Sequence, residues 1–184
     1  MDRTIHLLGL NHTSADVAVR EAFALSGAEC RVCDIIPLDG DICEALVLST
    51  CNRVEILAVG KNGNTKEALL EHWAGYCRRA CAELSPHVYA YSGCEAVTHL
   101  FKVASGLDSL VLGDPQILGQ LKDAYRKALE EGSAKVILNR LLHKAFMTAK
   151  RVRTETGVAA SAVSISYAAV SLARRPVPPF RPRR

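Results

Sequence analysis

Segments with the character of β-strands lie in the first half of this 184-residue chain. Four short apolar runs, each bounded by polar or turn-forming residues, are typical of strands, and they cover residues 5–10, 44–50, 54–59 and 87–91. From Cys94 onward the pattern is helical, apart from residues 106–115. The chain is therefore predicted to have an α+β fold, in which a small mixed sheet packed with helices is followed by a helical extension.

Several helices have recognisable starts and stops. Asp16 suits the N-cap of the first helix and Thr65 that of the third, while Pro37 ends the second and Gly157 follows the sixth. The predicted helices cover residues 16–25, 28–36, 65–83, 94–105, 116–131, 134–155 and 159–173.

The net charge of +4 comes from one end of the chain. Residues 174–184 hold five arginines, four prolines and no acid, so we expect this tail to be disordered. The remainder carries 18 basic against 19 acidic side chains, counted from the totals of 23 and 19. Overall basicity is therefore weak evidence for nucleic-acid binding.

No signal peptide and no membrane-spanning run is visible, so we expect a cytoplasmic protein with no membrane partner. The seven cysteines are then expected to be reduced, and most of them to be packing residues. Cys30 and Cys33 have the spacing of a zinc-ligand pair, which Cys43, or Cys77 and Cys81, would have to complete. Packing is the simpler interpretation, and no metal is predicted.

Cys51 is the residue that points to chemistry. It follows an apolar run at residues 45–48 and stands among Thr50, Asn52 and Arg53. A buried strand that ends in such a cluster can deliver a nucleophile to a surface cleft. A neighbouring guanidinium favours the ionised form of a thiol, which is the reactive form.

Two further segments suit acyl chemistry. His99 lies in an apolar helical stretch, where it is either an acid–base group or an ordinary core histidine. Residues 106–120 gather serine, aspartate, glutamine and glycine around a helix start, whose N–H groups suit a developing oxyanion. The plainer alternative is a loop with Pro115 in the first helical turn and Asp114 as the N-cap.

Five blocks follow one another in order along the chain. They are the opening at residues 9–12, the Cys51 block at 49–55, the His99 block at 99–109, the block at 113–120 and the basic block at 149–156. Together they resemble the glutamyl-tRNA reductase family, which opens the five-carbon route to tetrapyrroles and porphyrins. The resemblance runs from about residue 4 to 173.

The resemblance implies that the Cys51 thiolate attacks the ester of glutamyl-tRNA and forms a thioester, which NADPH reduces to glutamate-1-semialdehyde. His99 would assist the acyl transfer. Arg53 would hold the glutamate side-chain carboxylate, and Asp114, where the family often has glutamate, would face the α-ammonium. The implied substrate-binding residues are Thr50, Cys51, Asn52, Arg53, Ser109, Asp114, Pro115, Gln116 and Gln120.

The resemblance also implies a division of the chain. Residues 1–157 would be the catalytic domain, residues 158–173 the start of a connecting helix and residues 174–184 an unrelated tail. Family members continue into an NADPH-binding domain and a dimerisation domain, which form a homodimeric enzyme. No G-x-G-x-x-G loop occurs here, so we expect at most esterase activity on glutamyl-tRNA.

Two other hypotheses stay open. The helix over residues 134–155 has a basic face, which would suit a tRNA-binding module without turnover. This face carries Arg140, Lys144, Lys150, Arg151 and Arg153. The chain would otherwise be a folded remnant without activity.

Overall fold

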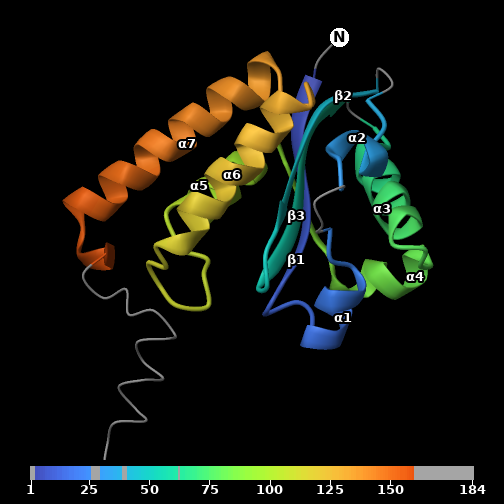
Figure 1. Ribbon diagram of the computed structural model, residues 1–184, viewed down its shortest axis with the longest axis horizontal. Helices are drawn as coiled ribbons and strands as arrows, with labels where there is room; N and C mark the ends of the chain where they lie inside the picture. Colours follow the sequence, from blue (N-terminus) through green and yellow to red (C-terminus); the bar gives the residue numbers. More distant parts are fainter. Residues whose placement is uncertain (1–2, 26–29, 39–40, 62, 160–184) are drawn as a thin grey trace, which may run out of the picture.

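A four-stranded sheet lies at the centre of the part of the chain that the structure describes, between two layers of helices (Figure 1). The structure is a computed structural model and describes residues 3–25, 30–38, 41–61 and 63–159. The strands are β1 (Arg3–Asn11), β2 (Ile42–Ser49), β3 (Arg53–Lys61) and β4 (Tyr89–Ser92), in the order β2-β3-β1-β4. The predicted helix at 159–173 and the tail at 174–184 lie outside the described residues, apart from Ala159.

The α+β class is confirmed, but the sheet is antiparallel in every pairing rather than mixed. Only three residues connect β2 to β3, and so short a connection allows only an antiparallel pair. Because Asn11 pairs with Arg53, the end of β1 lies beside the start of β3. The Cys51 turn and the loop after β1 therefore meet at one end of the sheet.

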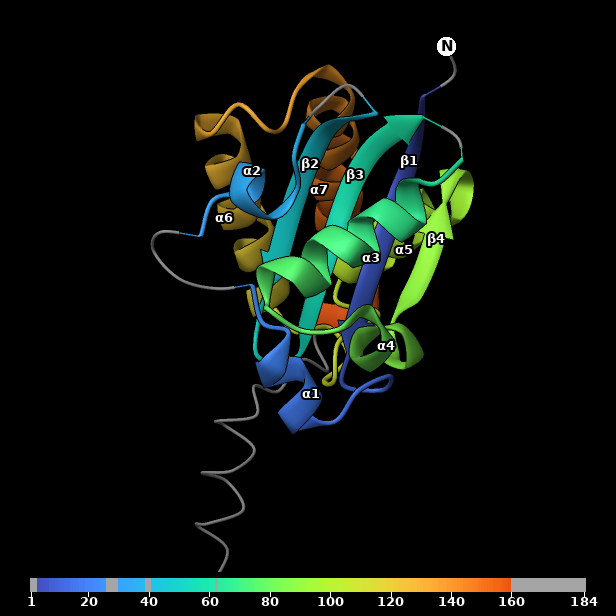
Figure 2. The ribbon, with the colours of Figure 1, turned by 90° about the vertical axis from the view of Figure 1, so that its right-hand side faces the viewer.

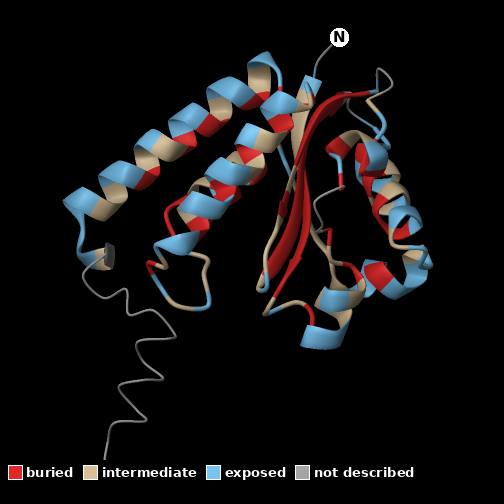
Figure 3. Ribbon diagram, viewed as in Figure 1, coloured by how far each residue is buried: buried red, intermediate tan, exposed pale blue. Residues whose placement is uncertain are grey.

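Three long helices cover one face of this sheet: α5 (Gly93–Ala104), α6 (Gln116–Glu130) and α7 (Val136–Glu155). Leu7, Leu46 and Leu57 of the strands form one buried cluster with apolar residues of these helices. In Figure 3 the two strands β2 and β3 are buried along nearly their whole length, as is the second half of β1. The helical second half is therefore a layer of the domain, because its apolar faces are needed to cover the sheet, and not an appended extension.

The other face is covered by α1 (Val17–Ala22), α2 (Val32–Ile35), α3 (Thr65–Tyr76) and α4 (Cys81–Leu84) (Figure 2). Leu8, Leu10 and Ile56 alternate with the residues of the first face and pack into this second cluster. The indole N–H of Trp73 in α3 donates to the carbonyl of Phe23 at 2.9 Å, which ties α3 to the end of α1.

Several predicted boundaries need correction. Asp16 caps α1 as expected, at 2.9 Å from the N–H of Val19. The segment predicted as a helix over 28–36 contains the single turn α2 in its described part, because Arg31 and Ile36 on either side of it have extended backbones. The helix predicted over 65–83 ends at Tyr76, where the chain turns and restarts as α4.

Two shorter corrections concern residues 64–91. Asn64, not Thr65, is the N-cap of α3, because the Thr65 hydroxyl donates to the carbonyl of Lys61 instead, at 2.6 Å. The fourth strand begins at Tyr89, because Pro86 places residues Ser85–His87 in a 3₁₀ turn, labelled η1.

Candidate functional site

Cys51 stands exposed at the tip of the turn between β2 and β3. The N–H of Thr50 donates to the carbonyl of Arg53 at 2.8 Å, which closes the turn. The Thr50 hydroxyl accepts from the N–H groups of Asn52 at 3.2 Å and Arg53 at 3.1 Å. The predicted motif is therefore a short turn held by its own threonine, and it presents the thiol to solvent.

Two neighbouring segments, α1 and the loop after β1, make hydrogen bonds to this turn. The Nε of Arg20 in α1 donates to the carbonyl of Cys51 at 3.4 Å, and Nη1 of the same side chain donates to the carbonyl of Ala15 at 2.7 Å. The N–H of His12 donates to the carbonyl of Asn52 at 3.0 Å. Arg20 was not among the predicted site residues, because its approach depends on how α1 docks below the sheet.

A small cavity of about 30 Å³ opens beside Cys51. It brings the Cys51 turn together with the loop before α6 and the first turns of that helix. Pro115, the N-cap of α6, is the one predicted pocket residue outside its lining. The lining consists of Thr50, Cys51, Asn52, Arg53, Ser109, Leu110, Asp114, Gln116, Ile117 and Gln120.

Asp114 lines the cavity and also makes a hydrogen bond to the first residue of α6. Its carboxylate accepts from the N–H of Gln116 at 2.9 Å. Gly106 and Gly113, both at positive φ, shape the loop that carries Asp114, and the N–H of Gly113 donates to the carbonyl of Gly106 at 2.9 Å. The plainer sequence interpretation therefore needs correction, because Pro115 rather than Asp114 is the N-cap of α6 and the helix begins at Gln116.

Behind the cavity lies a buried charged network centred on Glu55. The carboxylate oxygen Oε1 is 2.8 Å from Nη1 of Arg53 and 2.7 Å from Nε2 of His99. The Tyr89 hydroxyl donates to the same oxygen at 2.6 Å. His99 does not line the Cys51 cavity, and it is connected to the cavity through Glu55 and Arg53.

Asp108 completes the network from the cavity side. Its carboxylate accepts from Nη2 of Arg53 at 2.9 Å and from the side-chain amide of Asn11 at 3.5 Å. Nη2 of Arg53 also donates to the carbonyl of Asp108. Arg53 therefore has a carboxylate at each end of its guanidinium group and is 2% exposed, whereas the Asp108 side chain is 33% exposed.

The pKa values of this network follow from burial and from its charges. Burial alone would raise the pKa of Glu55, but the hydrogen bond from His99 and the charge of Arg53 outweigh it and lower the pKa. The pKa of Tyr89 is strongly raised, first by burial and then by the Glu55 carboxylate. Glu55 is therefore ionised and Tyr89 neutral across the ordinary pH range.

Gly9 in β1 makes this arrangement possible. A Cβ at this position would lie 2.8 Å from Cγ of Glu55 and 2.9 Å from the Tyr89 ring. Two side chains from the neighbouring strands β3 and β4 occupy the space that a larger residue would need. The glycine of the predicted opening block thus serves the site by leaving room for it.

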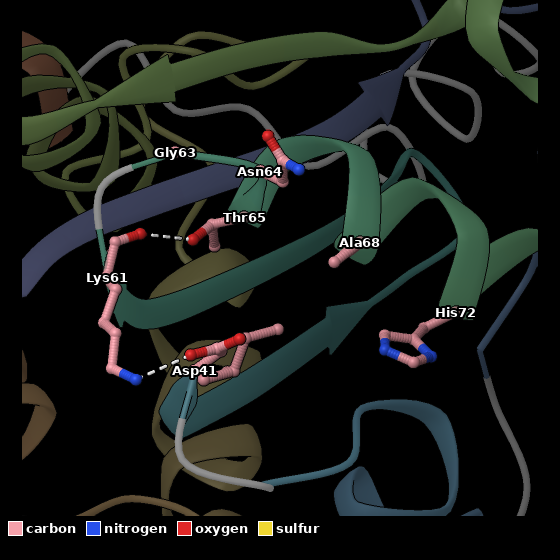
Figure 4. A pocket seen from close by; sticks show the side chains of 8 residues that line it. Asp41, Lys61, Gly63, Asn64, Thr65, Ala68 and His72 are labelled. Carbon is pink, nitrogen blue, oxygen red and sulfur yellow. Dashed lines mark hydrogen bonds and ion pairs between the residues drawn. The ribbon is translucent and has the colours of Figure 1, made fainter.

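Two larger hollows differ in their relation to Cys51. One, of about 570 Å³, lies on the α1 side of the same turn and is lined by Arg20, Ser49 and Cys51 among others. The other, of about 410 Å³, lies at the opposite end of β2 and β3, around the ion pair of Asp41 with Lys61 and the start of α3 (Figure 4). The second is remote from the candidate site because it lies at the far ends of both strands.

The described part of the chain offers neither a cluster of metal ligands nor a helix that could cross a membrane. No group of three or more histidine, cysteine, aspartate or glutamate side chains there is placed to hold a metal ion. Cys30 is buried in the cluster under α3 and Cys33 is half-buried. None of the described helices is both long enough and apolar enough to cross a bilayer.

Comparison with known proteins gives one consistent result. The family described as "Glutamyl-tRNAGlu reductase, N-terminal domain" matches residues 8–156. Glutamyl-tRNA reductases of Nitratidesulfovibrio vulgaris (strain DP4) and Lawsonia intracellularis are each 60% identical, over 177 and 176 residues. Each alignment covers 95% of this chain and 40% of the relative, so the chain spans about 40% of the length of these relatives.

A solved structure agrees with the sequence relatives. Glutamyl-tRNA reductase from Methanopyrus kandleri matches with a TM-score of 0.73 and 34% identity, over 93% of this chain and 39% of that one. The fold, the Cys51 turn and these similarities together show that the chain belongs to the glutamyl-tRNA reductase family, in which it corresponds to the N-terminal domain.

Proposed function

We propose that this chain carries out the acyl-transfer half of glutamyl-tRNA reduction, with Cys51 as the nucleophile. The observation that carries the proposal is the placement of an exposed thiol on the rim of a cavity lined by polar side chains. The relatives are named for glutamyl-tRNA, which supplies the substrate class. We infer that residues 1–157 form the catalytic domain and that residues 158–173 begin a connecting helix.

In the proposed reaction the Cys51 thiolate attacks the carbonyl carbon of the glutamyl ester. A carbon–sulfur bond forms, the bond from that carbon to the ribose oxygen breaks, and this oxygen takes a proton from solvent as the tRNA leaves. The given residues contain no G-x-G-x-x-G loop, and the proposed reaction of these residues is the acyl transfer alone. Water then cleaves the thioester and releases glutamate, which is esterase activity.

Arg53 is the proposed anchor for the glutamate side-chain carboxylate. Its guanidinium already pairs with Glu55 and Asp108, and Asp108 is the more exposed of the two carboxylates. We propose that the substrate carboxylate takes the place of Asp108 on Nη2, while Glu55 keeps the other end of the guanidinium in place. Asp114 would then face the α-ammonium, with Ser109, Pro115, Gln116 and Gln120 completing the pocket.

His99 is proposed to act in the acyl transfer, as the family resemblance implies. Its Nε2 is hydrogen-bonded to Glu55, so it acts on the cavity through the Glu55–Arg53 pair. A positioning role through this pair is the simpler proposal. His99→Asn would then lower the rate of acyl transfer without abolishing labelling of Cys51.

The proposal is tested by alkylation with iodoacetamide at neutral pH. Cys51 is expected to react, and glutamyl-tRNA is expected to slow that reaction at least about tenfold at saturation. Cys94 is exposed at the start of α5 and serves as the internal control, since its labelling should not respond to the substrate. Mass spectrometry of a quenched mixture should find one glutamyl group on the chain and none on Cys51→Ser.

The other hypotheses predict different results. A binding module would hold tRNA equally well with Cys51→Ser and would cleave no ester. A remnant would show neither protection of Cys51 nor tRNA binding. Either result contradicts the proposed acyl transfer.

A further inference from the structure

A groove runs between α6 and α7 on the outer surface of the helical layer, where the two helices lie side by side (Figure 1). Its volume is about 380 Å³. Leu118, Phe146 and Met147 supply apolar surface, and Met147 is 60% exposed. The remaining lining side chains are polar or cationic, namely Lys122, His143, Lys150, Arg153 and Thr154.

Aromatic rings form part of this groove. The rings of Phe146 and His143 have centroids 6.4 Å apart, and both pack edge-on against Tyr125 beneath them. Nζ of Lys122 lies 5.8 Å from the centroid of Phe146. The groove therefore combines a held aromatic surface with a cation directly above it.

The cations of the groove are not neutralised by neighbouring acids in the described structure. Arg151 pairs with Glu155 and Arg126 pairs with Asp123, outside the groove. No ion pair among the described residues involves Lys122, Lys150 or Arg153. Residues 160–184 contain no acid, so the chain's own C-terminal segment does not complement this charge.

The groove is adjacent to the candidate site through a single helix. Gln116 and Gln120 line the Cys51 cavity, while Leu118 and Lys122 of the same two turns of α6 line the groove. A polyanion whose end reaches Cys51 can therefore lie across α6 into the groove.

We propose that the groove binds unpaired nucleotides of the RNA whose 3′ end carries the glutamyl ester. A base stacks against Phe146 and His143, and Lys150 and Arg153 contact the flanking phosphates. The inference rests on the proposed function, since it takes glutamyl-tRNA as the substrate. It adds a second contact region, which reads the single-stranded end of the RNA next to the ester.

The test measures fluorescence anisotropy of a labelled single-stranded RNA octamer that ends in CCA and carries no ester. The 184-residue chain and its variants are titrated at about 50 and 200 mM salt. Phe146→Leu should weaken binding about fivefold or more without changing the salt slope, and Phe146→Tyr should retain binding. Lys150→Gln with Arg153→Gln should reduce the slope of log K against log salt by about 1.4.

Arg140→Gln with Lys144→Gln is the matched control. It removes two charges from exposed positions of α7 that lie outside the groove, and it should change affinity less than about twofold. If this control weakens binding as much as the groove pair, or if Phe146→Leu has no effect, the contact is diffuse electrostatics and the proposal is overturned. Thermal melting of each variant separates loss of binding from loss of fold.

Two further readouts distinguish this inference from other causes. If polyglutamate binds the groove as tightly as the RNA and displaces it, the groove fits an acidic protein segment and the proposal is wrong. Cys51→Ser should bind the octamer like the wild type. If the wild-type chain cleaves the ester but does not bind the octamer, the groove proposal alone is overturned. If the wild-type chain binds the octamer but cleaves no ester, the acyl-transfer proposal alone is overturned.

Discussion

Glu55 has almost no contact with water, and side chains from three elements hold it. Arg53 reaches it along β3, Tyr89 from β4 and His99 from α5. A buried carboxylate is stable only when its charge is matched and its oxygen atoms accept hydrogen bonds. Because Arg53 also lines the Cys51 cavity, Glu55 connects the stability of the sheet with the shape of the candidate site.

Replacing Glu55 by glutamine should lower the free energy of unfolding by about 3 kcal/mol at pH 7, because a buried arginine loses its partner. The folded-state pKa of Glu55 is lowered, so its contribution is present above its unfolded pKa of about 4.3 and is lost as pH falls through the folded pKa. Urea unfolding should therefore show a smaller difference from the wild type at about pH 3 than at pH 7. Glu95→Gln, exposed on α5, is the control, and an equal difference at both pH values would contradict the argument.

The placement of single site residues could be predicted from the sequence where those residues belong to a short local motif. Cys51 and Arg53 stand together in a turn, and Asp114 stands at a helix start, so their placement in one cavity follows from the predicted elements. Tyr89 and His99 meet Glu55 across 34 and 44 residues of chain. Their contact depends on the register of the strands and on the docking of α5. Neither feature has a signal in any local sequence pattern.

At the scale of elements, the end of α3 illustrates how a short motif overrides a long periodic pattern. The N–H of Arg79 donates to the carbonyl of Ala74 at 2.9 Å, and that of Arg78 donates to Gly75 at 3.0 Å. These are the two bonds of a Schellman motif, whose C′ residue adopts the left-handed conformation. Arg78 occupies that position at φ 54°, where glycine is usual. The sequence prediction extended this helix because no glycine marked its end.

Arg78→Gly should therefore stabilise the protein, by about 0.5 to 1 kcal/mol, since glycine adopts positive φ without a steric penalty. The gain should appear in urea unfolding as a higher midpoint with an unchanged slope. Arg79→Gly is the matched control, because Arg79 is exposed and has no positive φ. This second variant should be neutral or destabilising, and a similar gain in both would contradict the assignment of strain to position 78.

At the scale of the whole molecule, the helical layer is fastened to the outer strand of the sheet by polar contacts as well as by its core. The N–H of Ala45 in β2 donates to the carbonyl of Ser133 at 2.9 Å, so the segment before α7 covers the free edge of this strand. The N–H of Val32, the first residue of α2, donates to the Glu131 carboxylate at 2.7 Å, which links the two helical layers around that edge. The sequence predicted both halves but not that they enclose one sheet, because the apolar faces alone do not say which surfaces meet.

Glu44 is the strongest of these connections. It is 3% exposed in β2, and its carboxylate accepts from the N–H groups of Lys135 and Leu138 at 2.9 Å and Ile137 at 3.0 Å. It thus acts as a distant cap for α7, whose own N-cap residue has no side-chain hydrogen bond. A negative charge at this point also complements the helix dipole.

Glu44→Gln should reduce the free energy of unfolding by about 2 to 3 kcal/mol. The substitution replaces one of the two acceptor oxygens by an NH₂ group, which then faces backbone N–H donors. The loss of stability should be larger at the start of α7 than in the rest of the domain. Hydrogen exchange at Ile137 and Leu138 should accelerate more than at Trp73, which lies on the other face of the sheet. Glu130→Gln, exposed on α6, should change neither exchange nor unfolding by a comparable amount. Equal acceleration at all three amides would mean that Glu44 stabilises the whole fold without acting as the fastening point of α7.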